Sequence, residues 1–185
     1  MTWRVLGSLS AVPALDRPDL LAAPVAHALK LLDPADAARV GVAEIDPALA
    51  DTTAFCEAYG SPLDGSANCV VVAGRRGGDT RFAACLVLAT TRADVNGVVR
   101  RRIDARKASF APMDEAVELT GMEYGGITPV GLPDGWPLLV APEVATAEAV
   151  VIGSGIRGSK LAIPGDVVAS LPGAQVVDDL ARPAG

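Results

Sequence analysis

Residues 121–133 read G-M-E-Y-G-G-I-T-P-V-G-L-P, with four glycines and two prolines in thirteen residues. Glycine and proline at this density interrupt helices and strands, so the stretch predicts a loop of defined shape. A second glycine-rich stretch, G-S-G-I-R-G-S-K at 153–160, begins 28 residues after the first glycine of the G-G pair. It lies between two short apolar runs, A-V-V-I-G and S-K-L-A-I-P, and both runs predict strands.

The second stretch is close to a phosphate-binding P-loop but does not form one. A P-loop needs G-x-x-x-x-G-K-[ST] and leads from a strand into a helix whose N-terminal amides hold the phosphates. Here Ser159 occupies the lysine position, Lys160 comes one place late, and Pro164 stops the following segment early. We therefore expect neither a nucleoside-triphosphate site nor a Rossmann dinucleotide site, which also needs a following helix.

Length and composition predict one domain. The chain has 185 residues, half of them apolar and only 4% aromatic, which suffices for one core and gives no reason for a second. No apolar stretch approaches the length of a membrane span, and the N-terminus lacks a signal-peptide pattern. We therefore expect a cytoplasmic protein without membrane contact.

Few residues could support metal or nucleophilic chemistry. Cys56, Cys69 and Cys85 are widely spaced and make neither a disulfide framework nor a zinc knuckle. His27 is the only histidine, and it lies in an apolar segment far from any nucleophile signature. The sequence thus predicts no metal, no cofactor, and no catalysis by a Ser-His-Asp or Cys-His arrangement.

The charge is unevenly distributed. The net charge is −6, yet nine of the sixteen basic residues lie between Arg75 and Lys107, where only three aspartates oppose them. The overall charge argues against a general nucleic-acid coat or a DNA partner. A basic stripe on an acidic protein is compatible with a local polyanion contact, and equally with a solvated surface.

The remaining pattern alternates strands and helices. In residues 1–40 we expect a helix near 20–32 and a short second helix opened by Asp33-Pro34. Beyond them we expect helices ending at Gly60 and Gly121, one capped by Thr91 or Asp94, and a last one at 164–171. The predicted strands are near 41–46, 68–73, 81–89, 136–142, 149–153, 159–164 and 174–178, the second and third forming a hairpin.

Together the two glycine loops resemble those of YbaK-like aminoacyl-tRNA editing domains, also called prolyl-tRNA synthetase-associated domains. The resemblance runs from about Val42 to Leu180 and includes E-I-D-P, A-N-C-V-V-V, R-K-A-S-F-A-P and I-G-S-G-I-R-G, with G-G-I-T-P followed by V-G as its most diagnostic part. It implies an α/β fold: a single domain at 41–185 with a curved mixed β-sheet and flanking helices. Residues 1–40 would be a helical N-terminal accessory segment.

The resemblance also implies an activity and a partner. The family hydrolyses, without a metal, the ester that joins a small misacylated amino acid to the terminal adenosine of a tRNA. Such an ester is already activated, so oxyanion stabilisation and a positioned water can suffice. The tRNA's own 2′-hydroxyl is implied to help activate this water. The expected partner is the acceptor end of an aminoacyl-tRNA; association with an aminoacyl-tRNA synthetase and the oligomeric state are left open.

The site residues follow from the same resemblance. Glycines 125 and 126 let backbone amides approach the ester because no side chain intervenes. The expected catalytic residues are Asn68, Gly125, Gly126, Thr128 and Pro129. The expected substrate-binding residues are Ile127, Gly153, Ser154, Gly155, Arg157 and Lys107.

Asn68 stands where bacterial members of the family usually carry a lysine. Asparagine can hydrogen-bond the α-amino group, the ester carbonyl or a water, but it carries no charge. Two alternatives therefore stay open beside the hydrolase. One is a catalytically weak or inactive module that binds tRNA 3′ ends or an aminoacyl-adenosine-like ligand. The other is a hydrolase of a small-molecule ester or amide.

Overall fold

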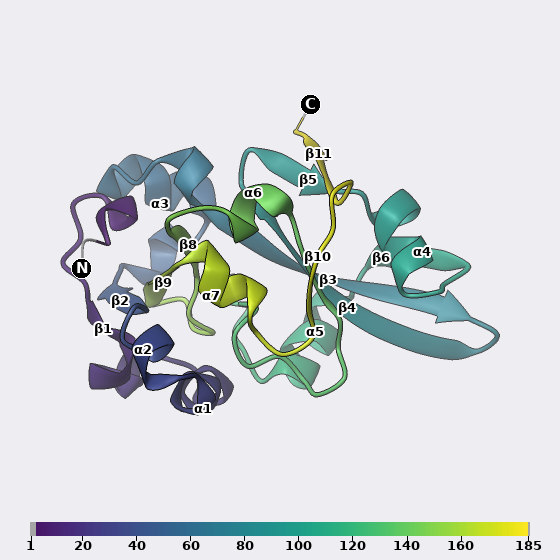
Figure 1. Cartoon of the computed structure of the whole chain (residues 1–185), viewed down its shortest axis with the longest axis horizontal. Coiled ribbons are helices and arrows are strands. Elements are labelled where there is room, and N and C mark those ends of the chain that lie inside the picture. Colours follow the sequence, from purple (N-terminus) through teal and green to yellow (C-terminus); the bar gives the residue numbers. More distant parts are fainter. Residues whose placement is uncertain (1–2, 185) are drawn as a thin grey trace.

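Two main β-sheets meet near the start of the longest hairpin of the chain (Figure 1). A computed structural model describes residues 3–184. The first sheet is antiparallel throughout, with the order β1-β2-β9-β8. Its strands are β1 (Val12–Pro13), β2 (Gly41–Glu44), β9 (Ser159–Ile163) and β8 (Val150–Gly153).

The second sheet is mixed and has the order β10-β7-β4-β3-β6. Strands β10 and β7 run parallel to β4, whereas β3 is antiparallel to both of its neighbours. The strands are β10 (Ala174–Val176), β7 (Leu138–Val140), β4 (Asp79–Leu88), β3 (Ala67–Arg76) and β6 (Lys107–Phe110). A third, two-stranded sheet pairs β5 (Thr91–Ala93) with β11 (Ala181–Pro183).

The β3–β4 hairpin is the longest regular feature and projects from the body of the molecule (Figure 1). It is paired along its full length, from Ala67 opposite Leu88 to Arg76 opposite Asp79. Its turn consists of glycines 77 and 78, both with positive φ, as a tight two-residue hairpin turn requires. The hairpin predicted from the sequence is confirmed, and its strands are longer than expected because the polar tip is also paired.

A single parallel bridge joins Ser66, just before β3, to Val151 of β8 and so connects the two main sheets. The predicted α/β class with mixed strands and flanking helices is confirmed. The expected curved sheet is divided into two because this bridge is the only ladder contact between them in residues 3–184.

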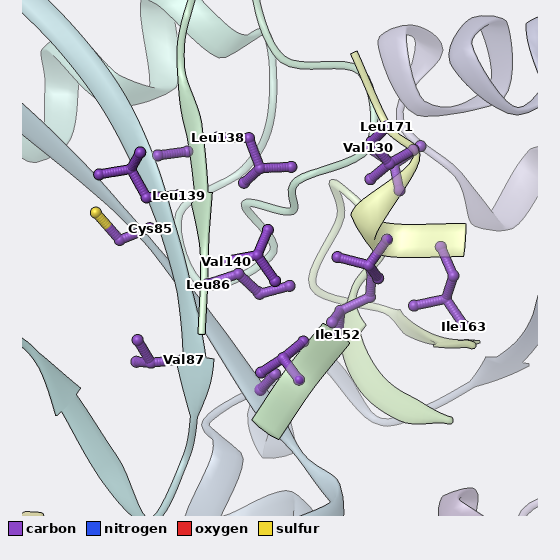
Figure 2. Close-up of a cluster of buried hydrophobic side chains, with 14 of the residues drawn as sticks. Cys85, Leu86, Val87, Val130, Leu138, Leu139, Val140, Ile152, Ile163 and Leu171 are labelled. Atoms are coloured by element: carbon purple, nitrogen blue, oxygen red, sulfur yellow. The ribbon is translucent and has the colours of Figure 1, made fainter. Parts of the chain in front are cut away.

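The core fills the space between these sheets. Figure 2 shows Leu86 of β4 and Val140 of β7 near Ile152 of β8, and all three side chains are almost completely buried. Most core side chains are valine, alanine and leucine, so close packing of small groups replaces the usual aromatic centre. A second cluster around Phe55 lies on the other face of the first sheet and includes Ala43 and Ala162.

The α-helices are α1 (Ala23–Leu31), α2 (Pro34–Ala37), α3 (Thr52–Tyr59), α4 (Arg100–Arg102), α5 (Met113–Thr120), α6 (Pro142–Ala145) and α7 (Gly165–Ala169). Short 3₁₀ turns are η1 (Arg4–Leu6), η2 (Ala14–Asp16), η3 (Pro18–Leu20), η4 (Pro47–Leu49) and η5 (Leu63–Gly65). None of the helices in residues 3–184 is long and apolar enough to cross a membrane.

Local capping explains where several helices begin and end. The Asp33 carboxylate accepts from Ala35 N at 2.8 Å, as the Asp-Pro pair predicted. Helices α3 and α5 end at Gly60 and Gly121, both left-handed, which confirms the predicted stops. Of the two caps expected for the next helix, Asp94 is the one used.

Two local predictions were incomplete. The segment after Asp94 begins as a π-helical turn, η6 (Val95–Val99), before it continues into α4, so the expected regular helix is wrong over its first five residues. Strand β6 was not expected, because its run K-A-S-F has only four residues, three of them exposed, too short for its alternation of polar and apolar side chains to predict a strand. Its pairing with β3 is a tertiary contact that local pattern does not encode.

Residues 3–40 pack against the rest of the domain. Val25 and Leu29 of α1 are fully buried in the main core. Ala22 N donates to Ser154 O at 3.1 Å, and the Ser159 hydroxyl donates to Leu20 O. The helices expected here are present, and this segment supports the second glycine loop from behind. That it forms an accessory unit of its own stays a prediction.

We expect Leu29→Ala to lower the free energy of unfolding by about 2–5 kcal/mol, because it leaves a cavity in the shared core. Leu31 lies on the same helix but is 72% exposed, so Leu31→Ala should change stability by less than about 0.5 kcal/mol. Urea unfolding of the two variants would compare them. Equal, small effects would show that α1 contributes nothing to the core.

Candidate functional site

The two glycine loops, 28 residues apart in sequence, lie directly against each other. Gly155 N donates to Gly126 O at 2.7 Å, and Glu123 N donates to Gly155 O at 2.8 Å. The Glu123 carboxylate also accepts from Arg157 N at 2.7 Å. The loops therefore form one hydrogen-bonded unit at the end of β8.

The loops can approach so closely because Gly126 and Gly153 have no side chains. A Cβ on Gly126 would lie 2.7 Å from backbone atoms of Ile156, and one on Gly153 would lie 2.4 Å from Gly126 O. Both distances are too short for any real carbon contact with a backbone atom. Two glycines facing each other across the loops thus fix how closely the backbones approach.

A pocket of about 670 Å³ opens beside this unit, within the size range of small-molecule sites. It lies between the start of α3, the start of β3, the segment from Phe110 to Met113, and the two glycine loops. Of the expected site residues, Asn68, Gly125, Ile127 and Gly153 line this pocket. Three segments distant in sequence, namely both glycine loops and the first strand of the hairpin, are therefore brought together.

The other expected residues lie elsewhere. Gly126, Thr128, Pro129, Ser154 and Gly155 are buried behind the pocket wall, so they shape the loops without facing the cavity. Ser154 is fully buried, and its hydroxyl is 2.6 Å from the Ser159 hydroxyl. Lys107 is not in the pocket, because β6 carries it to the tip of the hairpin opposite Arg75. The catalytic and binding roles of all these residues stay predictions.

Arg157 ties the loops to their surroundings. Its guanidinium donates to Tyr124 O at 3.2 Å and to Pro47 O at 3.0 Å. The side chain bridges the first loop and the turn before α3, and it does not line the pocket. Its proposed contact with a phosphate or adenosine would have to use the remaining guanidinium donors.

Asn68 faces the pocket with its amide oriented by a neighbour. The Thr52 hydroxyl donates to Asn68 Oδ1 at 2.8 Å. This bond occupies the carbonyl side of the amide, so the NH₂ group, with two donors, is the part left for a ligand. Thr52 was not among the expected site residues, because its position opposite β3 follows only from the packing of α3.

The sequence also gave no site role to Lys160, although it lines the same pocket. Its side chain comes from β9 and is only 7% exposed, and Nζ donates to Ala50 O at 2.8 Å. Nζ also lies 5.5 Å from the centre of the Phe55 ring. Burial lowers the pKa of Lys160 below its usual value, and the nearby Asp51 carboxylate acts in the opposite direction. The available signal was one lysine directly before the apolar residues of a short strand, S-K-L-A-I.

The rim of the pocket carries exposed apolar side chains. Phe110 is 63% exposed, Tyr124 57% and Met113 52%, and all three border the cavity. Aromatic faces at the edge of a pocket are suited to stacking against a nucleobase. Because these residues come from two separate segments, one holding Phe110 and Met113 and the other Tyr124, no local motif indicated this arrangement.

Basic side chains gather at the far end of the hairpin. Arg75, Arg76, Arg106 and Lys107 line a depression beside the Gly77-Gly78 turn, together with the acidic Asp79. Arg76 and Arg81 pair with Asp104, which offsets part of their charge. One continuous strand, β3, therefore leads from Asn68 in the pocket to a cationic tip.

The family model described as "Aminoacyl-tRNA editing domain" matches residues 46–171, more than half of the chain. The chain belongs to the aminoacyl-tRNA editing domain family. The matched region contains the pocket, both glycine loops and the hairpin, so the predicted resemblance is confirmed. No curated protein sequence matches this editing domain significantly.

Solved structures agree with this editing-domain fold. A candidate trans-editing enzyme for prolyl-tRNA synthetase matches with a TM-score of 0.70 and 24% identity, over 89% of this chain and 97% of that one. A scaffold from a study of computational epitope grafting matches with a TM-score of 0.71 and 22% identity over the same shares. A protein described as hypothetical matches with a TM-score of 0.63 and 22% identity, over 72% and 85%. At these identities the similarity concerns the fold alone.

We expect Gly126→Ala to lower the free energy of unfolding by about 1–3 kcal/mol, because the added Cβ forces the two loops apart. Gly158→Ala is a matched control, since its Cβ would find its nearest neighbour 3.8 Å away, at Pro47. That variant should stay within about 0.5 kcal/mol of the wild type. Thermal or urea unfolding would separate the two, and equal stabilities would show that the loops do not depend on this close approach.

Proposed function

We propose that this editing domain is a trans-acting deacylase that hydrolyses the ester of a small misacylated amino acid on tRNA. The observation that carries the proposal is the convergence of the Gly125 backbone, Gly153 and the Asn68 amide in one pocket. Family membership makes an aminoacyl-tRNA the expected substrate.

The pocket supports a small, uncharged amino acid. Its lining includes Ala50, Ala67, Cys69 and Val71, all with short side chains. Apolar pockets discriminate against larger side chains by steric exclusion, and against charged ones by the cost of desolvation. Alanine, serine, cysteine, threonine and proline are therefore the amino acids to compare. Phe110 and Tyr124 at the rim would receive the terminal adenine by stacking.

The proposed mechanism requires attack by a water on the ester carbonyl. The Asn68 NH₂ group and the Gly125 backbone amide are donors available for the substrate carbonyl or the water, whereas Gly126 N already donates to Glu123 O at 2.9 Å. The 2′-hydroxyl of the terminal ribose assists in activating the water. The ester C–O bond then breaks, the ribose oxygen takes a proton, and the free amino acid leaves.

The cationic tip of the hairpin extends this proposal to the body of the tRNA. Asn68 and Arg75 are seven residues apart along β3, a span of about 23 Å at the usual strand rise. A 3′ end seated in the pocket would place part of the acceptor stem within reach of Arg75, Arg106 and Lys107. Contacts to phosphates there would position the tRNA without reading its sequence.

A deacylation time course would test the activity. With tRNA charged in turn with the five small amino acids, we expect the wild type to hydrolyse at least one mischarged pair above the uncatalysed rate. Asn68→Ala removes one donor to the reacting groups and should lower kcat by roughly 10²-fold. Lys30→Ala, on the exposed face of α1, should have no effect.

A tRNA-binding measurement at varied salt, made beside the time course, distinguishes the alternatives. Salt-sensitive binding of tRNA without hydrolysis of any ester would favour a module that only binds 3′ ends. Absence of both binding and hydrolysis would direct the search to small-molecule esters or amides.

Salt dependence would test the hairpin contact. We expect Lys107→Gln and Arg75→Gln each to weaken tRNA binding. Each should also reduce the slope of the logarithm of the association constant against the logarithm of the salt concentration by about 1 per lost phosphate contact. Lys30→Gln serves as the charge-matched control, because it lies on α1, away from the hairpin. If all three variants kept the wild-type slope, the tip would not contact the tRNA backbone.

A further inference from the structure

Lys160 is the only buried residue with an ionisable, positively charged side chain among residues 3–184. Burying a charge is costly unless a partner of opposite charge or several hydrogen bonds compensate it. Lys160 forms no ion pair within the described residues, and its one protein hydrogen bond is to Ala50 O. An ammonium has three donors, so two are left. Packing alone gives no reason for this arrangement.

The side chain reaches the pocket through a gap left by a glycine. In the antiparallel ladder Lys160 is the direct partner of Gly153, and both residues line the cavity. Residues paired in this way have their side chains on the same face of the sheet. Because Gly153 has no side chain, the Lys160 stem has no direct cross-strand neighbour on that side. The ammonium lies toward the start of α3, where Thr52 orients Asn68.

The region around the ammonium decides what it can bind. Ala50, Phe55 and Val151 line the pocket together with Lys160 and are neutral, whereas Asp51 lines it as well and carries a carboxylate. The nearest carboxylate identified is Asp51, which is exposed and already accepts from Thr53 N at 3.0 Å. An incoming α-ammonium would be repelled by Lys160, whereas an oxygen that gains negative charge would be attracted. A partly desolvated site strengthens that attraction.

We propose that Lys160 is a catalytic residue of this pocket and that its ammonium stabilises the oxyanion formed when water attacks the aminoacyl ester. The inference rests on the proposed deacylase function for its reaction. The part of the inference that concerns binding does not depend on that reaction. It assigns to the pocket a preference for a ligand with a tetrahedral anionic centre attached to an adenosine. Asn68 supplies a neutral donor to the same pocket, and Lys160 supplies the charge.

The step is balanced without any further reactant. Water adds to the carbonyl carbon and its proton passes to the solvent or to the ribose oxygen, while the carbonyl oxygen gains negative charge beside Lys160. The C–O bond to the ribose then breaks, the carbonyl re-forms, and the amino acid is released. Lys160 keeps its proton throughout and acts only by hydrogen bonding and charge.

Two adenosine derivatives would test the inference independently of turnover. One carries a 1-aminoethylphosphonate monoester on its 3′-oxygen, which is tetrahedral and anionic. The other carries a 3′-alanylamide, whose carbonyl centre is planar and uncharged, and both derivatives carry the same α-ammonium. Calorimetry would measure both with the wild type, Lys160→Gln, Lys160→Met and the surface control Lys30→Gln. Lys160→Gln retains a donor for Ala50 O but has no charge, so it separates charge from support of the fold.

We expect Lys160→Gln to weaken phosphonate binding by at least about tenfold while amide binding changes less than about twofold. In the deacylation assay the same variant should lose about 10²–10³-fold in kcat, with KM little changed. Lys160→Met should show the same losses as Lys160→Gln, and Lys30→Gln should match the wild type.

The outcomes separate this inference from the proposed function. If the wild type binds the phosphonate through Lys160 but hydrolyses no charged tRNA, the anion site is supported and the proposed deacylase function is refuted. A wild type that binds the phosphonate no more tightly than the amide would overturn the inference, whatever the deacylation assay gives. An equal loss of both ligands in Lys160→Gln, with wild-type stability, would also overturn it.

Discussion

The close approach of two backbone segments is the constraint on which the site depends. Gly126 and Gly153 face each other across the two loops, and any side chain at either position would occupy space already filled by backbone. The hydrogen bond from Gly155 to Gly126 then fixes the loops in register. Because β8 leads directly into the second loop, the position of the pocket wall follows from the ladder of the first sheet.

The N-terminal segment also packs closely against the two glycine loops. Ala22 lies so close to Gly155 that a Cβ there would be 2.4 Å from the alanine side chain, and Pro24 crowds Gly131 in the same way. Leu29 anchors the segment in the core. Residues outside the matched family region thus help to hold the loops that form the site.

The long hairpin separates the pocket from an exposed, largely basic tip. At one end of β3, Asn68 lies among small and apolar groups in the pocket. At the other end, Arg75 lies beside Lys107 of β6. A ten-residue strand is stiff enough to keep the two regions at a fixed separation, so a ligand that contacts both must have matching dimensions. The proposed tRNA substrate, with its 3′ end in the pocket, is the ligand expected to meet this requirement.

Local chemistry encoded in the sequence by itself determined the Asp33 cap, the stops at Gly60 and Gly121, the glycine turn of the hairpin and the presence of two shaped loops. These features depend on residues next to each other in the chain, where backbone preferences act directly. Only the tertiary structure decided that Thr52 orients Asn68, that Lys107 lies far from the pocket and that Lys160 enters it. Those outcomes depend on which strands pair and which face each side chain takes, and a single shift in register would reverse them.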